Sequence, residues 1–344
     1  MKHWKASASG TPSRGHGGSG LGSSGTGPRG GGAPGALPHP HGACRAEIAG
    51  KLRYSLEERA DFPTVGDWVA AALLEPDRAL IHHLLPRQTA LYRRAASHQL
   101  VKQVIGANID IALVVQAVEG DFNLNRLDRY LAAAHGGGIR PVVVLNKSDL
   151  LLPGAVDALE REILVRHPGQ GVIRTSRLET GGLENLRAFL EVRKTHCVLG
   201  SSGVGKSTLI NGVLGAEELE NQAISGWNQR GKHTTTHRAL FVVPAGGTLI
   251  DTPGMRELGP TDELEGIERT FFDIVSLAGN CCFSDCRHKD EPGCAILAAL
   301  ESGSLDPKKL ENYEKLRGKP PTMRPRRQRN ARSPGATVSS TSGY

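Results

Sequence analysis

The stretch GSSGVGKST, residues 200–208, decides the fold of this chain. It matches the phosphate-binding loop pattern, in which a glycine and four further residues precede Gly-Lys-Ser or Gly-Lys-Thr. The apolar segment THCVLG at 195–200 comes before it, and STLINGVLG at 207–215 follows it. These segments predict the strand and the helix that such a loop needs on either side, so the chain is expected to bind a nucleotide by its phosphates.

The residues of this loop have distinct expected roles. Backbone amides turned inward at glycines would surround the β-phosphate, the Lys206 ammonium would bridge the β- and γ-phosphates, and the Ser207 hydroxyl would bind Mg²⁺. The residues expected at the phosphates are Gly200, Ser201, Ser202, Gly203, Val204, Gly205, Lys206, Ser207 and Thr208.

A second motif, NKSD at 146–149, follows the apolar segment PVVVL at 141–145 and matches the guanine-reading Asn-Lys-x-Asp element of GTPases. The Asp149 carboxylate can accept hydrogen bonds from the N1 and N2 donors of guanine. Adenine has an acceptor at N1 and nothing at C2, so GTP is expected rather than ATP. The residues expected at the base are Asn146, Lys147, Ser148 and Asp149, with Thr175 and Ser176 at the end of a short strand beside them.

The order of the two motifs is unusual. In a Ras-like GTPase the phosphate loop lies near the N-terminus and the base-reading motif follows it, whereas here NKSD comes first. This order predicts a circularly permuted GTPase domain. Continuous apolar strands alternate with helical segments between 109 and 251, which indicates an α/β fold with a mostly parallel sheet covered on both faces.

Two further segments complete the expected nucleotide site. In DTPG at 251–254, Asp251 would hold Mg²⁺ through water and the Gly254 amide would meet the γ-phosphate. In GKHTTT at 231–236, Thr235 is expected to complete the Mg²⁺ shell in the GTP state. A plain flexible loop is the alternative for this threonine run.

Hydrolysis needs a group that positions the attacking water. Ras-like enzymes carry glutamine after DTPG, but this chain has Met255, and a thioether cannot position water. His233 is the candidate for that role, so the candidate catalytic residues are Lys206, His233 and Thr235.

A cysteine-rich segment near the C-terminal end indicates a metal site. Three thiols and one imidazole in the spacing C-x4-C-x-H-x5-C, at Cys281, Cys286, His288 and Cys294, form a ligand set typical of closed, structural zinc sites. Cys282 is adjacent and is the alternative to Cys281 as the first ligand; we favour Cys281.

Composition and charge predict a globular protein with two basic ends. A hydrophobic content of 38% and a charged content of 22% are ordinary for globular proteins, and no apolar stretch suggests a membrane span or a signal peptide. A cytoplasmic protein is therefore expected. The net charge of +7 comes from the ends: residues 1–43 carry four basic and no acidic side chains, and residues 315–332 carry eight and none. Such basic ends are either solvated tails or arms that bind RNA phosphates.

The sequence divides into five parts. Residues 1–43 are rich in Gly, Ser and Pro and are expected to be disordered, and 44–97 read as a small antiparallel sheet typical of an oligonucleotide-binding (OB) barrel. A first strand is not evident upstream of Glu47, so an incomplete barrel is the open alternative. The GTPase domain is expected at 98–260, a helical zinc-binding domain at 261–318 and a basic disordered tail at 319–344.

The permuted order of NKSD, GSSGVGKST, GKHTTT and DTPG, followed by the cysteine set, resembles the RsgA (YjeQ) family of small ribosomal subunit biogenesis GTPases. The resemblance covers about residues 47–317 and includes FPTVGDWV, VIGANIDIALVV and GDFNLNRLDRYL. It implies an OB barrel, a permuted GTPase domain and a zinc domain, with GTP, Mg²⁺ and one structural Zn²⁺. It also implies a monomer that binds the small ribosomal subunit and its rRNA late in maturation, with ribosome-stimulated GTP hydrolysis and no membrane partner.

Two alternatives remain open from the sequence. Met255 favours an RNA- or ribosome-binding module that holds GTP with little turnover. An ATPase of the same fold is disfavoured by Asp149.

Overall fold

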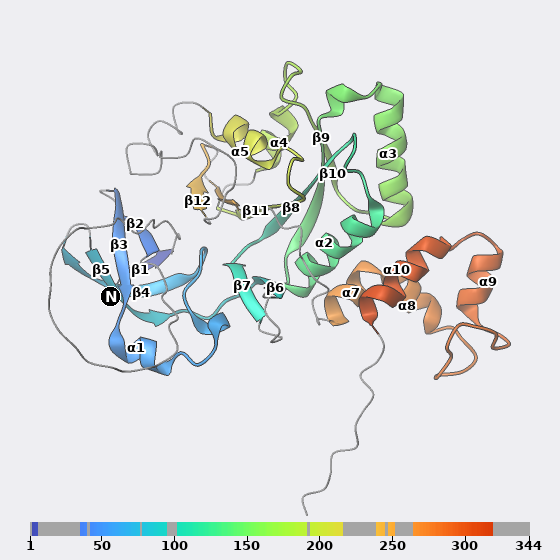
Figure 1. Ribbon diagram of the computed structural model, residues 1–344, viewed down its shortest axis with the longest axis horizontal. Helices are drawn as coiled ribbons and strands as arrows, with labels where there is room; N and C mark the ends of the chain where they lie inside the picture. The colour runs from blue at the N-terminus through green and yellow to red at the C-terminus, as the bar shows by residue number, and fades with distance from the viewer. Residues whose placement is uncertain are drawn as a thin grey trace, which may run out of the picture.

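The computed structural model describes residues 2–5, 35–39, 42–75, 78–94, 102–190, 193–215, 239–244, 247–251 and 264–318. Figure 1 shows an N-terminal sheet, a central sheet flanked by helices, and a C-terminal group of helices beside the central part. Within these residues, no helix combines the length and the apolar character that crossing a membrane requires.

The N-terminal sheet has five strands in the order β1-β4-β5-β3-β2. Its strands are β1 (Lys2–Lys5), β2 (Gly35–His39), β3 (Gly42–Ile48), β4 (Trp68–Glu75) and β5 (Arg78–Leu84), and α1 (Gly50–Ser55) with the 3₁₀ turn η1 (Arg59–Asp61) joins β3 to β4. Apolar side chains such as Ala46, Val69 and Ile81 form its core.

Three expectations for this region need correction. The sheet is not wholly antiparallel, because β3 and β5 pair in parallel. Disorder is wrong for Lys2–Lys5 and Gly35–His39, which join the sheet through backbone hydrogen bonds that need no large apolar side chain. A strand upstream of Glu47 therefore exists. Because β1 and β2 end the pairing order of the described strands, closure into an OB barrel stays a prediction.

An antiparallel ribbon of β6 (Ala90–Arg94) and β7 (Lys102–Ala107) connects this sheet to the central domain. The FPTVGDWV segment packs against it: a Cβ at Gly66 would lie 2.0 Å from the Ala107 carbonyl oxygen. The fully buried Asp67 accepts hydrogen bonds from Arg87 Nε at 2.7 Å and Nη2 at 2.8 Å. This bidentate pair fixes the loop that leads into β4.

The central sheet has six strands in the order β10-β9-β8-β11-β13-β12, all parallel except the edge strand β12. In this order the strands are β10 (Val172–Thr175), β9 (Arg140–Asn146), β8 (Ile111–Ala117), β11 (Thr195–Leu199), β13 (Thr248–Asp251) and β12 (Ala239–Val242). The predicted mostly parallel sheet is confirmed, and its apolar strands are buried because both faces are covered.

Among the described residues, four helices cover the two faces of this sheet. Side chains of α2 (Leu124–Gly136) and α3 (Pro153–Arg166) pack on one face, and those of α4 (Glu184–Phe189) and α5 (Lys206–Leu214) pack on the other. The 3₁₀ turn η2 (Ser148–Leu150) follows β9.

The C-terminal helices are α7 (Leu264–Thr270), α8 (Phe272–Ala278), α9 (Ala295–Glu301) and α10 (Pro307–Arg317). They surround the fully buried Phe271, and their core includes Ala132 of α2. A Cβ at Gly266 would lie 2.3 Å from the Ala132 carbonyl oxygen, so α7 and α2 approach at backbone distance. Figure 1 shows this group beside α2, on the side away from the N-terminal sheet.

Candidate nucleotide-binding site and cysteine cluster

The phosphate loop lies between β11 and α5, at the carboxyl edge of the central sheet. Gly200 has φ +147° and Gly205 has φ +95°, both in the region that side-chain-bearing residues rarely adopt. A Cβ at Gly200 would also lie 2.4 Å from the Val115 carbonyl oxygen. The loop therefore requires glycine at these positions.

Lys206 begins α5 and points back into the loop. Its ammonium donates to the carbonyl oxygens of Gly200, at 2.9 Å, and Ser201. Burial lowers the pKa of Lys206, while the negative charges of Asp251 and Asp121 oppose the shift. Asp251 ends β13, the strand next to β11, where it pairs with Val198. A lysine and a carboxylate thus lie near one another at the edge where ligands bind in parallel sheets.

NKSD lies at the carboxyl end of β9 and contacts the phosphate loop directly. The buried Asn146 amide donates to the Val204 carbonyl at 2.8 Å, and the Lys147 ammonium donates to the Gly203 carbonyl at 3.1 Å. Lys147 has φ +62°, a left-handed conformation that turns the chain from β9 into η2. The two motifs therefore meet, although they stand in reversed order.

The segment at Thr175 and Ser176 lies beside NKSD, and its contact with the base stays a prediction. The Thr175 hydroxyl donates to Asn146 Oδ1 at 3.0 Å, and the Ser176 hydroxyl donates to the Asp149 carboxylate. The amides of Leu178 and Glu179 in turn donate to the Ser176 oxygen, at 3.1 and 3.2 Å. Asp149 is thereby held in place by the loop that follows β10.

The cysteine cluster brings together the four predicted ligands. The ligand atoms of Cys281, Cys286, His288 and Cys294 all lie within 4.8 Å of one another. Cys281 Sγ is 3.6 Å from His288 Nδ1 and 3.9 Å from Cys294 Sγ, and the latter is 3.5 Å from His288 Nδ1.

These separations fit one tetrahedral metal ion. Zn–S bonds of about 2.3 Å place the sulfurs of such an ion roughly 3.8 Å apart, and three thiols with one imidazole are a set that zinc prefers. Cys282 is exposed and outside this group, so the clustered atoms include Cys281 rather than Cys282, and the ligand role of Cys281 stays a prediction. His288 has φ +59°, the left-handed conformation found in the turn that brings its ring to the thiols.

The family model for the RsgA GTPase matches residues 84–261, about half of the chain. This chain belongs to the RsgA GTPase family. Small ribosomal subunit biogenesis GTPase RsgA 2 of Vibrio parahaemolyticus is 39% identical, over 81% of this chain and 76% of that protein. RsgA of Opitutus terrae is 42% identical, over 82% and 81%, and RsgA of Xanthomonas euvesicatoria is 44% identical, over 82% and 76%.

Solved structures agree with the RsgA assignment. The crystal structure of YjeQ from Thermotoga maritima covers 82% of this chain and 92% of its own, with a TM-score of 0.60 and 27% identity. YloQ, a circularly permuted GTPase, has the same fold, with a TM-score of 0.58, 24% identity and coverage of 81% and 88%. The predicted permuted GTPase fold is confirmed, and as an RsgA-family member the chain is a GTP hydrolase.

Three predicted site residues of this RsgA-family chain, His233, Thr235 and Gly254, lie outside the described residues, as does Met255. Their roles stay predictions.

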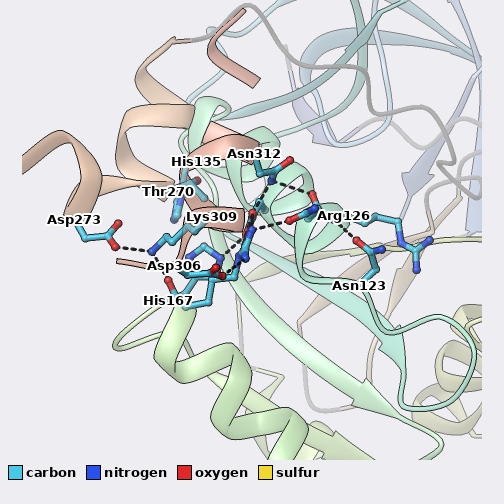
Figure 2. Close-up of polar contacts among 12 residues, drawn as sticks. Asn123, Arg126, His135, His167, Thr270, Asp273, Asp306, Lys309 and Asn312 are labelled. Carbon is cyan, nitrogen blue, oxygen red and sulfur yellow. Dashed lines mark hydrogen bonds and ion pairs between the residues drawn. The ribbon is translucent and has the colours of Figure 1, made fainter. Parts of the chain in front are cut away.

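Sequence reasoning missed a polar junction between the GTPase domain and the C-terminal helices (Figure 2). At its centre is Asp128 of α2, which is fully buried. Its carboxylate accepts hydrogen bonds from Arg166 Nη2 at 2.6 Å, His167 Nε2 at 2.7 Å and Asn312 Nδ2 at 2.6 Å. The Lys309 ammonium extends the junction by donating to the Arg166 carbonyl and to Asp273, the latter at 2.7 Å.

The positively charged neighbours of Asp128 in the junction lower its pKa. Burial by itself would raise this pKa, but hydrogen bonds from His167 and Arg166 and their charges lower it below its ordinary value. Asp128 is thus held as a carboxylate between the two domains. The signal available in the sequence was Asp128 itself, an acidic residue between the leucines at 127 and 131 of a helical segment.

Proposed function

We propose that this RsgA-family GTPase binds the small ribosomal subunit late in its maturation and hydrolyses GTP in response to it. The observation that carries the proposal is the direct contact of NKSD with the phosphate loop, through Asn146 and Val204. One guanine nucleotide can span both motifs only where they meet in this way. The relatives at 39–44% identity are small ribosomal subunit biogenesis GTPases, which supports the subunit as the partner.

In this proposal the base and the phosphates are held by different motifs. Asp149 accepts from guanine, and Ser176 orients its carboxylate. Lys206 contacts the β- and γ-phosphates, and Gly254 adds an amide at the γ-phosphate. Ser207, Thr235 and Asp251 would hold Mg²⁺, which would offset phosphate charge when bound, and His233 would orient the attacking water.

A binding module with little turnover is the second candidate, and Met255 in place of a water-positioning glutamine favours it. GTP hydrolysis measured with and without purified small ribosomal subunits separates the two. We expect a rate that rises and saturates with subunit concentration. Tight GTP binding to the subunit-bound protein without phosphate release would instead establish the module. His233→Ala is expected to lower turnover with little change in GTP affinity.

The cysteine cluster is proposed to hold a single structural Zn²⁺ through Cys281, Cys286, His288 and Cys294. Its test is the zinc content of the purified protein together with thermal unfolding. Cys286→Ser should lose the metal and destabilise the C-terminal helices, whereas Cys282→Ser, at the neighbouring exposed thiol, should retain both metal and stability. Equal zinc content in the two variants would contradict this ligand set.

The proposed location and RNA contacts follow from the small ribosomal subunit as the partner. A protein that acts on ribosomal subunits works in the cytoplasm, and the N-terminal sheet and the zinc domain are proposed to contact rRNA. The protein is proposed to act as a monomer.

A further inference from the structure

A polar cavity of about 230 Å³ lies between the N-terminal part of α2 and α10, and none of its lining residues belongs to the nucleotide motifs or the cysteine cluster. Its basic lining residues are Arg126, Arg129 and Lys315, and its acidic one is Glu311. The α2 part of this wall belongs to GDFNLNRLDRYL, a segment to which the nucleotide site gives no role.

The amide side chains in the wall are fixed by structural hydrogen bonds. Asn123 caps α2 by accepting from the Arg126 amide at 2.8 Å, Asn125 accepts from Arg166 at 2.7 Å, and Asn312 donates to Asp128 at 2.6 Å. Figure 2 shows Asn312 on one side of this region and Asn123 with Arg126 on the other. The cavity is therefore bounded by side chains that the polar junction holds in place.

The basic side chains are not neutralised to the same degree. Arg126 pairs with Asp121 at 2.6 Å, but its buried Nε has no hydrogen-bond partner among the described residues. Within the same part of the chain, Arg129 and Lys315 make no ion pair. The cavity thus presents the positive charges of Arg129 and Lys315, which no ion pair among the described residues neutralises.

The chemistry of this wall fits a nucleic-acid backbone. Guanidinium, ammonium and amide groups are those with which proteins contact phosphates and sugars. Lys315 also lies at the start of the basic run that continues through residue 332 in the sequence. A cavity whose lining includes the first residue of such a run suits an extended polyanion better than a single free phosphate.

We propose that this cavity binds the sugar-phosphate backbone of ribosomal RNA, with Arg129 and Lys315 contacting phosphates. The inference rests on the proposed function, because it assigns one contact of the small subunit to named residues. The same helix α2 approaches the phosphate loop, where Tyr130 interacts with Ser201. RNA bound at Arg129 therefore contacts a helix that also touches the nucleotide site.

The test measures binding of small ribosomal subunits to the full chain over a series of salt concentrations. Arg129→Gln combined with Lys315→Gln is expected to weaken binding about tenfold at moderate salt and to reduce the logarithmic salt slope by about 1 to 2. Lys308→Gln is the matched control, because Lys308 is an exposed residue of α10 outside the cavity lining. Glu311→Gln should strengthen binding.

Each outcome bears on a separate claim. A double variant with the affinity and salt slope of the Lys308→Gln control would overturn the cavity assignment, provided that thermal unfolding shows both variants folded. A wild-type chain that binds no subunits, and whose hydrolysis does not respond to them, would instead remove the proposed function.

Discussion

Asn146 donates its side-chain amide to the backbone carbonyl of Val204 at 2.8 Å, across 58 residues of sequence. Asn146 is 4% exposed and also accepts from the Thr175 hydroxyl. One buried amide therefore ties the base-side motif, the phosphate loop and the loop after β10 together. A Cβ at Gly205 would lie 2.4 Å from this amide nitrogen, so the loop and the side chain are closely fitted.

Asn146→Ala should weaken GTP and GDP binding together and lower stability. The substitution leaves the Val204 carbonyl and the Thr175 hydroxyl without their partner, at a cost of about 1–3 kcal/mol. Nucleotide titrations and urea unfolding measure the two effects. Gln170→Ala, which removes an amide bonded to the Pro141 carbonyl at 2.9 Å outside the motifs, is the control. Unchanged GDP affinity in Asn146→Ala would show that this contact does not shape the nucleotide site.

Asp149→Asn should change the base preference rather than abolish binding. Guanine presents an N2 donor to the carboxylate, whereas xanthine presents a carbonyl oxygen there, to which an asparagine amide can donate. The Ser176 hydroxyl can still donate to the remaining carbonyl oxygen of residue 149. Competition between GDP and xanthosine diphosphate measures the preference. A variant that still prefers guanine would place the base elsewhere.

Local patterns in the sequence predicted the central sheet and the nucleotide motifs. Strands such as Arg140–Asn146 are continuous apolar runs, and a phosphate loop has a fixed spacing, so both can be read from a few adjacent residues. The start of α10 carries an equally local signal, because Asp306 is its N-cap and Pro307 its first residue.

Features that depend on distant partners were missed. Asp128 meets Arg166 and Asn312, which lie 38 and 184 residues away, and no periodicity links them. Strand β1 depends on pairing with β4, from Lys2 with Ala71 to Lys5 with Trp68, across a long Gly-rich segment whose composition indicates disorder. Tertiary pairing decides such elements, and local composition does not report it.

Asp128→Ala should be strongly destabilising. Removing the carboxylate leaves the Arg166 guanidinium, whose side chain is 4% exposed, with the half-exposed Asp306, at 3.1 Å, as its one remaining ion-pair partner among the described residues. Breaking a buried pair in this way costs about 3–5 kcal/mol. The control is Asp157→Ala, which breaks the exposed Arg174–Asp157 pair at an expected cost below about 1 kcal/mol. Urea unfolding compares them, and equal losses would show that the junction contributes nothing beyond a surface ion pair.

His135 at the end of α2 gives the domain contact a pH dependence. Its Nδ1 lies 2.8 Å from the Thr270 hydroxyl of α7. Burial, followed by the positive charges of Arg269 and His167, lowers the pKa of His135 from 6.5 to about 4. Between these values the unfolded chain binds a proton that the folded chain does not. The stability that His135 contributes is therefore complete above pH 6.5 and is lost as the pH falls toward 4.

The size of this loss can be measured with one variant. The full pKa shift corresponds to about 3 kcal/mol, of which about 2 kcal/mol is lost between pH 7.5 and pH 5, and partial exposure of the ring reduces this expected loss to roughly 1 to 2 kcal/mol. His135→Gln keeps a group that can hydrogen-bond to Thr270 but does not titrate. Unfolding free energies at pH 7.5 and pH 5 should therefore fall less in the variant than in the wild type. The pKa of Asp128 is lowered, so this carboxylate stays ionised between pH 7.5 and pH 5. Its protonation therefore does not contribute to the difference between the wild type and His135→Gln. Parallel losses in both would mean that His135 is protonated in the folded chain and that the α2–α7 contact accommodates its charge.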